Sequence, residues 1–96
     1  MRPINSRVIV NTPGVPRPLS EQSRKVSTVT VTALAANTTA IHIGGPNVRA
    51  RAGEANGLPM SGGTRPDSAT FDNVDLFDFY IDAITASEGC SYLALE

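Results

Sequence analysis

The chain has one histidine and one cysteine, and these two side chains are its first candidates for catalysis. A Cys-His-Asp arrangement needs the imidazole within hydrogen-bond reach of a thiol whose pKa is lowered. Cys90 follows Gly89 at a step from a turn into a strand, where no helix N-terminus is present to lower that pKa. His42 lies between Ile41 and Ile43 and points to the opposite face, which favours an exposed or interface position. We predict no catalytic residues, no enzyme activity, and a half-buried Cys90.

An acidic cluster in the last third of the chain invites a calcium site. Calcium takes roughly six to eight oxygen ligands that converge from a loop. The spacing does not match an EF-hand, and in a strand these side chains would be spread along about 20 Å. A solvated face or a dock for a partner's arginines is the favoured interpretation, and a cation site is the alternative. The cluster contains Asp72, Asn73, Asp75, Asp78 and Asp82, of which Asp75, Asp78 and Asp82 are predicted to bind a partner.

Two glycine pairs, Gly44-Gly45 and Gly62-Gly63, are possible phosphate-binding loops. Neither is followed by the Lys-Ser/Thr pair and the helix of such a loop. Glycine also permits a positive φ at the corner of a sheet, which is the expected role here. With a single cysteine, the chain has no disulfide and no cysteine-based metal cage. The sequence therefore predicts no cofactor and no metal.

The charges are divided along the chain. All eight Lys and Arg residues lie at or before Arg65, where Glu21 and Glu54 are the carboxylates, so residues 1–65 carry a net charge of +6. The other seven of nine carboxylates follow, without a basic residue. Such opposed fields favour association within or between subunits. Arg49 and Arg51 share one face of an expected strand and suit pairing with protein carboxylates, whereas direct nucleic-acid binding is not expected.

Residues 1–25 are predicted to form an extended, basic, proline-rich arm rather than part of a domain. Three prolines and a glycine in residues 12–18 exclude a helix and favour a polyproline-like path. We expect the arm to lie on a neighbouring subunit; as an alternative, it wraps its own domain as an edge strand, with a short strand at residues 7–11. The arm residues predicted to bind a partner are Arg2, Ile4, Arg7, Val8, Val10 and Arg17.

Residues 26–96 show the pattern of a β domain. Residues 25–32 alternate valine with serine or threonine, which is typical of a strand with one buried face. Gly53 to Pro66 reads as a loop, and helical periodicity is absent. The predicted fold is all-β, a small antiparallel sandwich or barrel of six to seven short strands. Besides residues 25–32, strands are expected at residues 38–43, 48–51, 69–71, 74–83 and 90–95, and the short strand at residues 7–11 of the arm is the further candidate.

A recognisable stretch begins at Ile41 and reads Ile-His-Ile-Gly-Gly-Pro-Asn-Val through Val48. It is followed by a turn, Gly57-Leu58-Pro59-Met60, and by Asp-Leu-Phe-Asp-Phe-Tyr-Ile at residues 75–81. The closing pieces are Glu88-Gly89 and Ser91-Tyr92-Leu93. In this order, over residues 26–96, the pieces resemble a small β-sandwich module of tailed-bacteriophage virion accessory proteins.

The resemblance implies a non-enzymatic structural virion protein. We expect a capsid decoration or cement protein that bridges subunits of the major capsid protein, or other virion subunits, on the capsid exterior after synthesis in the host cytoplasm. A fibre, neck or tail accessory protein is the alternative, and a glycan-binding module is a third. A homo-oligomer is expected, with a trimer as one form. No membrane contact is expected, because no apolar run approaches the roughly 18 residues that span a bilayer.

Overall fold

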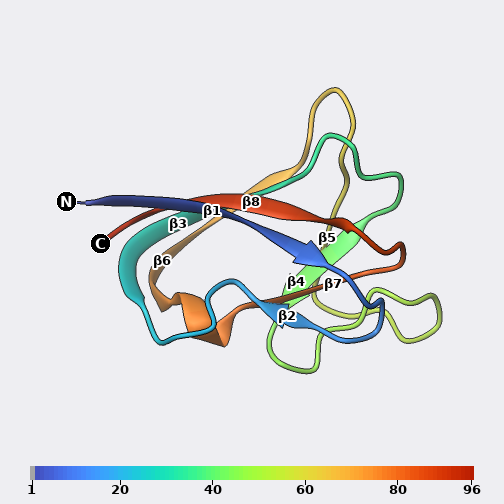
Figure 1. Ribbon diagram of the computed structural model, residues 1–96, viewed down its shortest axis with the longest axis horizontal. Coiled ribbons are helices and arrows are strands. Elements are labelled where there is room, and N and C mark those ends of the chain that lie inside the picture. The colour runs from blue at the N-terminus through green and yellow to red at the C-terminus, as the bar shows by residue number, and fades with distance from the viewer. Residues whose placement is uncertain (1) are drawn as a thin grey trace.

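The computed structural model describes residues 2–96, which form eight β-strands in two four-stranded antiparallel sheets. Sheet A has the strand order β1-β8-β3-β6, and sheet B has the order β2-β7-β4-β5 (Figure 1). The predicted all-β antiparallel sandwich is confirmed, with eight strands where six to seven were expected. The strands are β1 (Pro3–Val10), β2 (Arg17–Pro18), β3 (Lys25–Ala33), β4 (Ile41–Gly44), β5 (Leu58–Met60), β6 (Ser68–Asp75), β7 (Tyr80–Ala83) and β8 (Glu88–Leu95).

Strand β3 shows how the alternation in the sequence builds the core. Val29 and Val31 are fully buried between the sheets, and the threonines that alternate with them, Thr28, Thr30 and Thr32, face outward and are half-buried. β3 lies between β8 and β6, so that Thr30 is paired with Leu93 on one side and with Thr70 on the other. Each outward threonine therefore has an outward neighbour on both adjacent strands, and one outer face runs across the sheet.

The first 25 residues are part of the sandwich, which corrects the division into an arm and a separate domain. Residues 3–10 pair with β8 along their whole length, and Arg17–Pro18 pairs with β7 (Figure 1). Val10 is 0% exposed, Val8 is 6% exposed, and both belong to the core. Proline did not prevent this, because Pro3 begins a strand at a sheet edge, where a missing N–H is tolerated.

The close approach of β1 to β8 depends on one glycine. A methyl group on Gly89 would lie 1.9 Å from the carbonyl oxygen of Val8 and 3.0 Å from the Cα of Ile9. Gly89 is also fixed from its other side, because its carbonyl accepts hydrogen bonds from the N–H of Leu34 (3.1 Å) and from Nδ2 of Asn37 (2.8 Å). No side chain fits between the two strands at this point.

The expected single strand at residues 74–83 is interrupted. Leu76–Asp78 form a 3₁₀ turn, η1, between β6 and β7, and Leu76 is buried. Asp75 caps this turn by accepting a hydrogen bond from the N–H of Phe77 at 2.9 Å. Phe77 is consequently exposed, while Phe79 packs against the core with its ring centroid 4.7 Å from that of Phe71.

The expected strand at residues 48–51 does not form either. This stretch belongs to a loop that covers the outer face of sheet B, and Val48 and Ala50 are buried there. The loop is closed by hydrogen bonds from the N–H of Val48 to the carbonyl of Gly45 and from the N–H of Asn56 to the carbonyl of Arg49. The predicted loop at residues 53–66 includes the short strand β5.

We expect Gly89→Ala to lower the free energy of unfolding by about 1–3 kcal/mol, because the added methyl group overpacks the contact with β1. Urea denaturation measures the change. Gly45→Ala is the matched control, because the nearest atom to its added methyl group is 3.7 Å away, and its stability should change by about 0.5 kcal/mol or less. Equal stability of the two variants would show that β1 is not held against β8.

Candidate functional site

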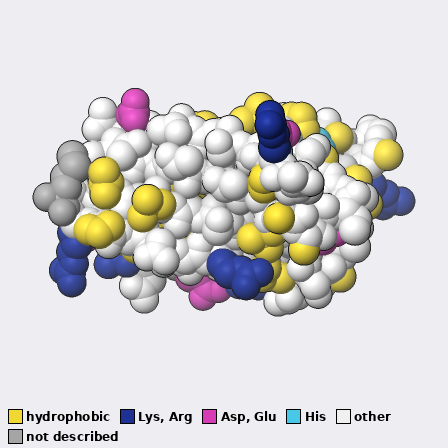
Figure 2. All heavy atoms as spheres, turned by 90° about the horizontal axis from the view of Figure 1, so that it is seen from above, with side chains coloured by type: hydrophobic (Ala, Val, Ile, Leu, Met, Phe, Trp, Pro, Cys, Tyr) yellow, Lys and Arg dark blue, Asp and Glu magenta, His cyan; other side chains and the backbone are white. Residues whose placement is uncertain are grey.

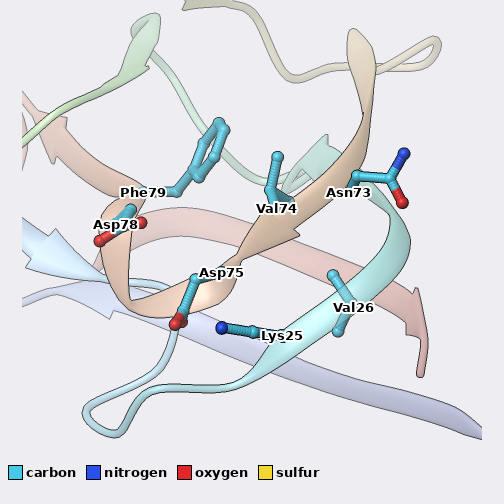
Figure 3. A pocket seen from close by; sticks show the side chains of 7 residues that line it. All are labelled: Lys25, Val26, Asn73, Val74, Asp75, Asp78 and Phe79. Carbon is cyan, nitrogen blue, oxygen red and sulfur yellow. The ribbon is translucent and has the colours of Figure 1, made fainter.

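A solvent-open pocket of about 560 Å³ lies where β3, β6 and η1 meet. Its apolar lining comes from Val26, Val74 and Phe79, and its charged lining includes Lys25 (Figure 3). Two of the predicted partner-binding carboxylates, Asp75 and Asp78, are brought together here. Asn73 also lines it and has φ = 54°, a left-handed conformation that asparagine adopts more readily than most residues.

Asp75 is already engaged by the chain itself. Its carboxylate accepts hydrogen bonds from Oγ of Ser23, from the N–H of Arg24 (2.8 Å) and from the N–H of Phe77 (2.9 Å). The hydrogen bond from Ser23, followed by the two main-chain hydrogen bonds, lowers the pKa of this carboxyl, and the nearby Lys25 ammonium acts in the same direction (Figure 3). Asp75 therefore joins the start of β3 to η1, and Asp78 is the carboxylate of the pocket that remains exposed.

Asp82 was predicted to bind a partner, and the structure corrects this because the residue is 0% exposed. Its two oxygens accept hydrogen bonds from the N–H of Gly14 and the N–H of Ala50, both at 2.9 Å. Asp82 thus attaches two loops to the outer face of sheet B. His42 is its cross-strand neighbour on that face, and Nδ1 of His42 is buried without a hydrogen-bond partner within residues 2–96.

The side chains that could form a Cys-His-Asp arrangement are held apart. Cys90 lies on the inner face of sheet A and is fully buried in the core, not half-buried as expected. His42 lies on the outer face of sheet B, on the far side of that core. Burial raises the pKa of the Cys90 thiol to about 12, so the thiol is protonated at neutral pH. The arrangement offers no activated nucleophile at this residue.

Glu88 is a second buried carboxylate, and it was not predicted from the sequence. Its oxygens accept hydrogen bonds from the N–H (2.6 Å) and Oγ1 (2.7 Å) of Thr38 and from the N–H (3.3 Å) and Oγ1 (3.0 Å) of Thr39. Burial alone would raise the pKa of this carboxyl, but the four hydrogen bonds outweigh it and lower the pKa below the usual 4.5. The carboxylate ties the connection between β3 and β4 to the start of β8.

The predicted partner-binding arginines are divided between different parts of the surface, although Arg7 and Arg17 line the same pocket beside β1. Arg17 donates from Nη1 to the carbonyl of Ile9 at 3.4 Å and lies 3.6 Å from a carboxylate oxygen of Glu21. Arg49 donates to the carbonyl of Val48, and Arg51 lies 3.8 Å from Glu54 in the loop over sheet B. Arg7 is exposed on β1, and Arg2 is exposed just before that strand. These five side chains do not form one surface.

The apolar partner-binding residues of the first strand are directed inward. Val8 and Val10 are in the core, and Ile4 is partly buried and packs against it. This corrects the expectation that all three rest on a neighbouring subunit. Their burial leaves the outward residues of β1 as the part of this segment that a partner can reach.

The outer face of sheet A is an exposed surface that was not predicted from the sequence. Among its residues, Arg7 and Asp72 carry charge, and they lie at opposite edges of the sheet. Leu93, near the centre, is 53% exposed. Its members follow from the strand registers and are Pro3, Asn5, Arg7 and Ile9 of β1, Ser91, Leu93 and Leu95 of β8, Thr28, Thr30 and Thr32 of β3, and Ser68, Thr70 and Asp72 of β6.

Figure 2 looks down on the side of the molecule where β1 and β8 lie in Figure 1. Most of the central surface in this view is uncharged, and the charged side chains lie toward its borders. The alternation of threonine in β3 was the signal that could have identified this face, because half of a regular strand must point away from the core.

Two further properties bear on the kind of site. Within residues 2–96, no three His, Cys, Asp or Glu side chains are grouped so that they could hold a metal ion. In the same part of the chain, no helix is long and apolar enough to cross a membrane.

Comparison with known proteins finds no matching family model, no matching curated protein and no matching solved structure. The fold therefore defines the class, an all-β antiparallel sandwich.

We expect Glu88→Gln to lower the free energy of unfolding at neutral pH by about 1–2 kcal/mol, because a neutral amide accepts these hydrogen bonds less strongly than a carboxylate. The pKa of Glu88 is lowered in the folded state, so its contribution is present above 4.5 and is lost as the pH falls through the folded pKa. The difference between variant and wild type should therefore shrink below pH 4.5.

Urea denaturation at several pH values measures this difference. Glu54→Gln, at an exposed position, is the control, and its free energy of unfolding should match that of wild type at every pH. A difference that stays constant from neutral to acid pH would contradict a structural role for the Glu88 carboxylate.

Proposed function

We propose that this protein is a structural, non-enzymatic subunit that attaches to a larger protein assembly through the outer face of sheet A. The observation that carries the proposal is the composition of that face. Exposed outer faces of antiparallel sheets are ordinarily polar, and charged residues are common on protein surfaces. Here, hydroxyl and apolar side chains fill the centre, around Leu93, and the charges lie at the edges.

Such a face is suited to burial against another protein. Burying a charge without a partner is costly, and this face has none at its centre to bury. Threonine is restricted in χ1 and short, so it loses little side-chain freedom when it is covered. The hydroxyl groups of Thr30 and Thr70 already lie 3.0 Å apart, which keeps part of the polar surface satisfied after water is removed. Leu93 supplies an apolar anchor in the middle.

The resemblance to virion accessory modules suggests the assembly. We propose a decoration or cement protein of a tailed phage head, with the major capsid protein as its partner and the exterior of the capsid as its location. A lattice of identical subunits offers one flat site per repeat to a small rigid sandwich. A fibre, neck or tail accessory protein built on the same sandwich is the second candidate.

The mode of attachment differs from the one that the sequence suggested. Residues 3–10 form a strand whose apolar side chains fill the core, so this segment is not available to wrap a neighbour as a separate arm. The outer face of sheet A takes over that role, and β1 contributes its outward residues to it.

We expect Leu93→Lys to reduce the amount of protein on purified phage particles about tenfold or more, because a lysine at this centre must be desolvated where a leucine was buried. Gradient-purified particles analysed by quantitative mass spectrometry give the occupancy. Leu58→Lys is the matched control, because Leu58 is also exposed but lies on β5 of sheet B, and its occupancy should match wild type.

Full occupancy by the Leu93→Lys protein would rule out the outer face of sheet A as the attachment surface. The wild-type copy number separates the two candidates: a number set by the capsid lattice supports decoration, and a number set by the tail symmetry supports a tail part. Absence of the chain from particles would overturn both.

A further inference from the structure

Strand β1 leaves one edge of sheet A open. The N–H of Glu96 donates to the carbonyl of Arg2, and the N–H of Ser87 donates to that of Val10, so the even-numbered residues of β1 direct their main-chain groups toward β8. The groups of the odd-numbered residues then face away from the sheet, because successive residues of a strand alternate. Asn5 and Arg7 are exposed at this edge.

The open stretch of β1 is short and has defined ends. The carbonyl of Ile9 is already bonded to Nη1 of Arg17 at 3.4 Å. At the other end, Pro3 has no N–H to donate. The main-chain groups open to a partner strand are therefore the N–H and carbonyl of Asn5, the N–H of Arg7 and the carbonyl of Pro3. The carbonyl of Arg7 accepts a hydrogen bond from Oγ of its exposed neighbour Ser6 at 3.5 Å, which a partner strand would have to replace.

Strand β6 leaves the opposite edge of the same sheet open. The N–H of Ala33 donates to the carbonyl of Asp67, so the odd-numbered residues from Asp67 onward face β3. The main-chain groups of Ser68, Thr70 and Asp72 face away from the sheet, and all three residues are exposed. Their side chains lie on the outer face of sheet A, as do those of Asn5 and Arg7 on β1.

The two open edges have opposite charge. The β1 edge presents Arg7, with Arg2 just before the strand. Arg17 and Glu21 lie beside the far end of β1 and are paired with each other, so they leave the net charge of this edge positive. The β6 edge presents Asp72, and Asp67 directly precedes the strand. The charge division of the sequence thus becomes, in the fold, a division between the two edges of one sheet.

We propose that copies of this chain associate head to tail, with β6 of one copy pairing antiparallel with β1 of the next. The strand directions permit this: adjacent strands of sheet A are antiparallel in the order β1-β8-β3-β6, so a following β1 placed beside β6 is again antiparallel. Because sheets twist, each copy is rotated relative to the one before it. Main-chain pairing of this kind is a common way in which a strand recognises an open sheet edge. The site uses the edges of the sheet and not the centre of its outer face, so it does not depend on the function proposed above.

Charge selects this pairing over the symmetric ones. Placing Asn5 opposite Asp72 and Arg7 opposite Thr70 brings Arg7 within diagonal reach of Asp72 of the neighbouring copy. Pairing β1 with a second β1 would bring Arg7 side chains together, and pairing β6 with a second β6 would do the same for Asp72. Like charges at such positions are destabilising, so charge at the edges discourages symmetric pairs and favours the heterologous one.

Sedimentation velocity of the full chain at low ionic strength tests the proposal. We expect self-association that grows with protein concentration and weakens as salt is added. Arg7→Glu and Asp72→Lys should each raise the dissociation constant about tenfold, because each replaces an attraction with a repulsion. An equimolar mixture of these two variants should associate as strongly as wild type, since Arg7 then meets Asp72 at one contact and Glu meets Lys at the next.

Arg51→Glu and Glu54→Lys are the matched controls, because both side chains are exposed in the loop over sheet B, and they should leave association unchanged. Thermal unfolding of each variant monitors the fold. A wild-type chain that stays monomeric at low salt, or variants that associate like wild type, would overturn the proposal. Association that is lost in both variants and not restored on mixing would also overturn it. Leu93→Lys should leave self-association unchanged, which keeps this test separate from that of the attachment face.

Discussion

Pairing between the two ends of the chain is the constraint on which the sandwich depends. Without tryptophan and with five aromatic residues, the core relies on small aliphatic side chains, and each strand that adds valines matters. β1 brings Val8 and Val10, but only because Gly89 lets its backbone approach β8. The N–H of Ser87, donating to the carbonyl of Val10, extends the same contact to the turn between β7 and β8. A thin core is thus completed by its most distant segments in sequence.

The carboxylates of the acidic half accept hydrogen bonds from main-chain N–H groups more often than they form ion pairs with arginines. Asp75, Asp82 and Glu88 each accept main-chain N–H hydrogen bonds from segments far along the chain. In residues 2–96, three ion pairs form, and of these only Arg24 with Glu96 joins the basic part of the sequence to the acidic part. The charge division is therefore not neutralised within the molecule. Opposed charges remain at the surface, where they can act between molecules.

The fold class could be predicted from the sequence because its signals are local. The alternation in residues 25–32 specifies β3, and Gly44-Gly45-Pro46 marks the end of β4. The partner of a strand is not a local property, and nothing in residues 7–11 indicates pairing with β8. The prolines that suggested an arm lie in the connection that follows β1 and in β2.

The candidate site was less predictable for the same reason. Asp75 interrupts the expected strand because it caps η1 and also binds Ser23 and Arg24, which are remote in sequence. Asp82 was predicted to lie on a solvated face, and its side chain does point away from the core that Ile81 and Ala83 enter. The loop of residues 45–57 covers that face of sheet B and buries Asp82. This loop has no regular periodicity from which its position could be predicted. Whether such a polar group is buried depends on the segment that covers it, and the local residue pattern contains no information about that segment.

The two proposed contacts support the same assembly: the outer face of sheet A binds the larger particle, and the edges of that sheet join neighbouring copies. Continuing the sheet from copy to copy keeps the outer faces on one side of the joined sheet, because β1 and β6 contribute to that face at its two borders. The twist of the sheet turns each face relative to the one before it. A weak edge contact then places several Leu93-centred faces side by side. Each further face binds at the high effective concentration set by the first, so modest contacts can together hold a small sandwich on a repeating surface. An isolated copy buries only one such face and would therefore bind the repeating surface with much lower affinity.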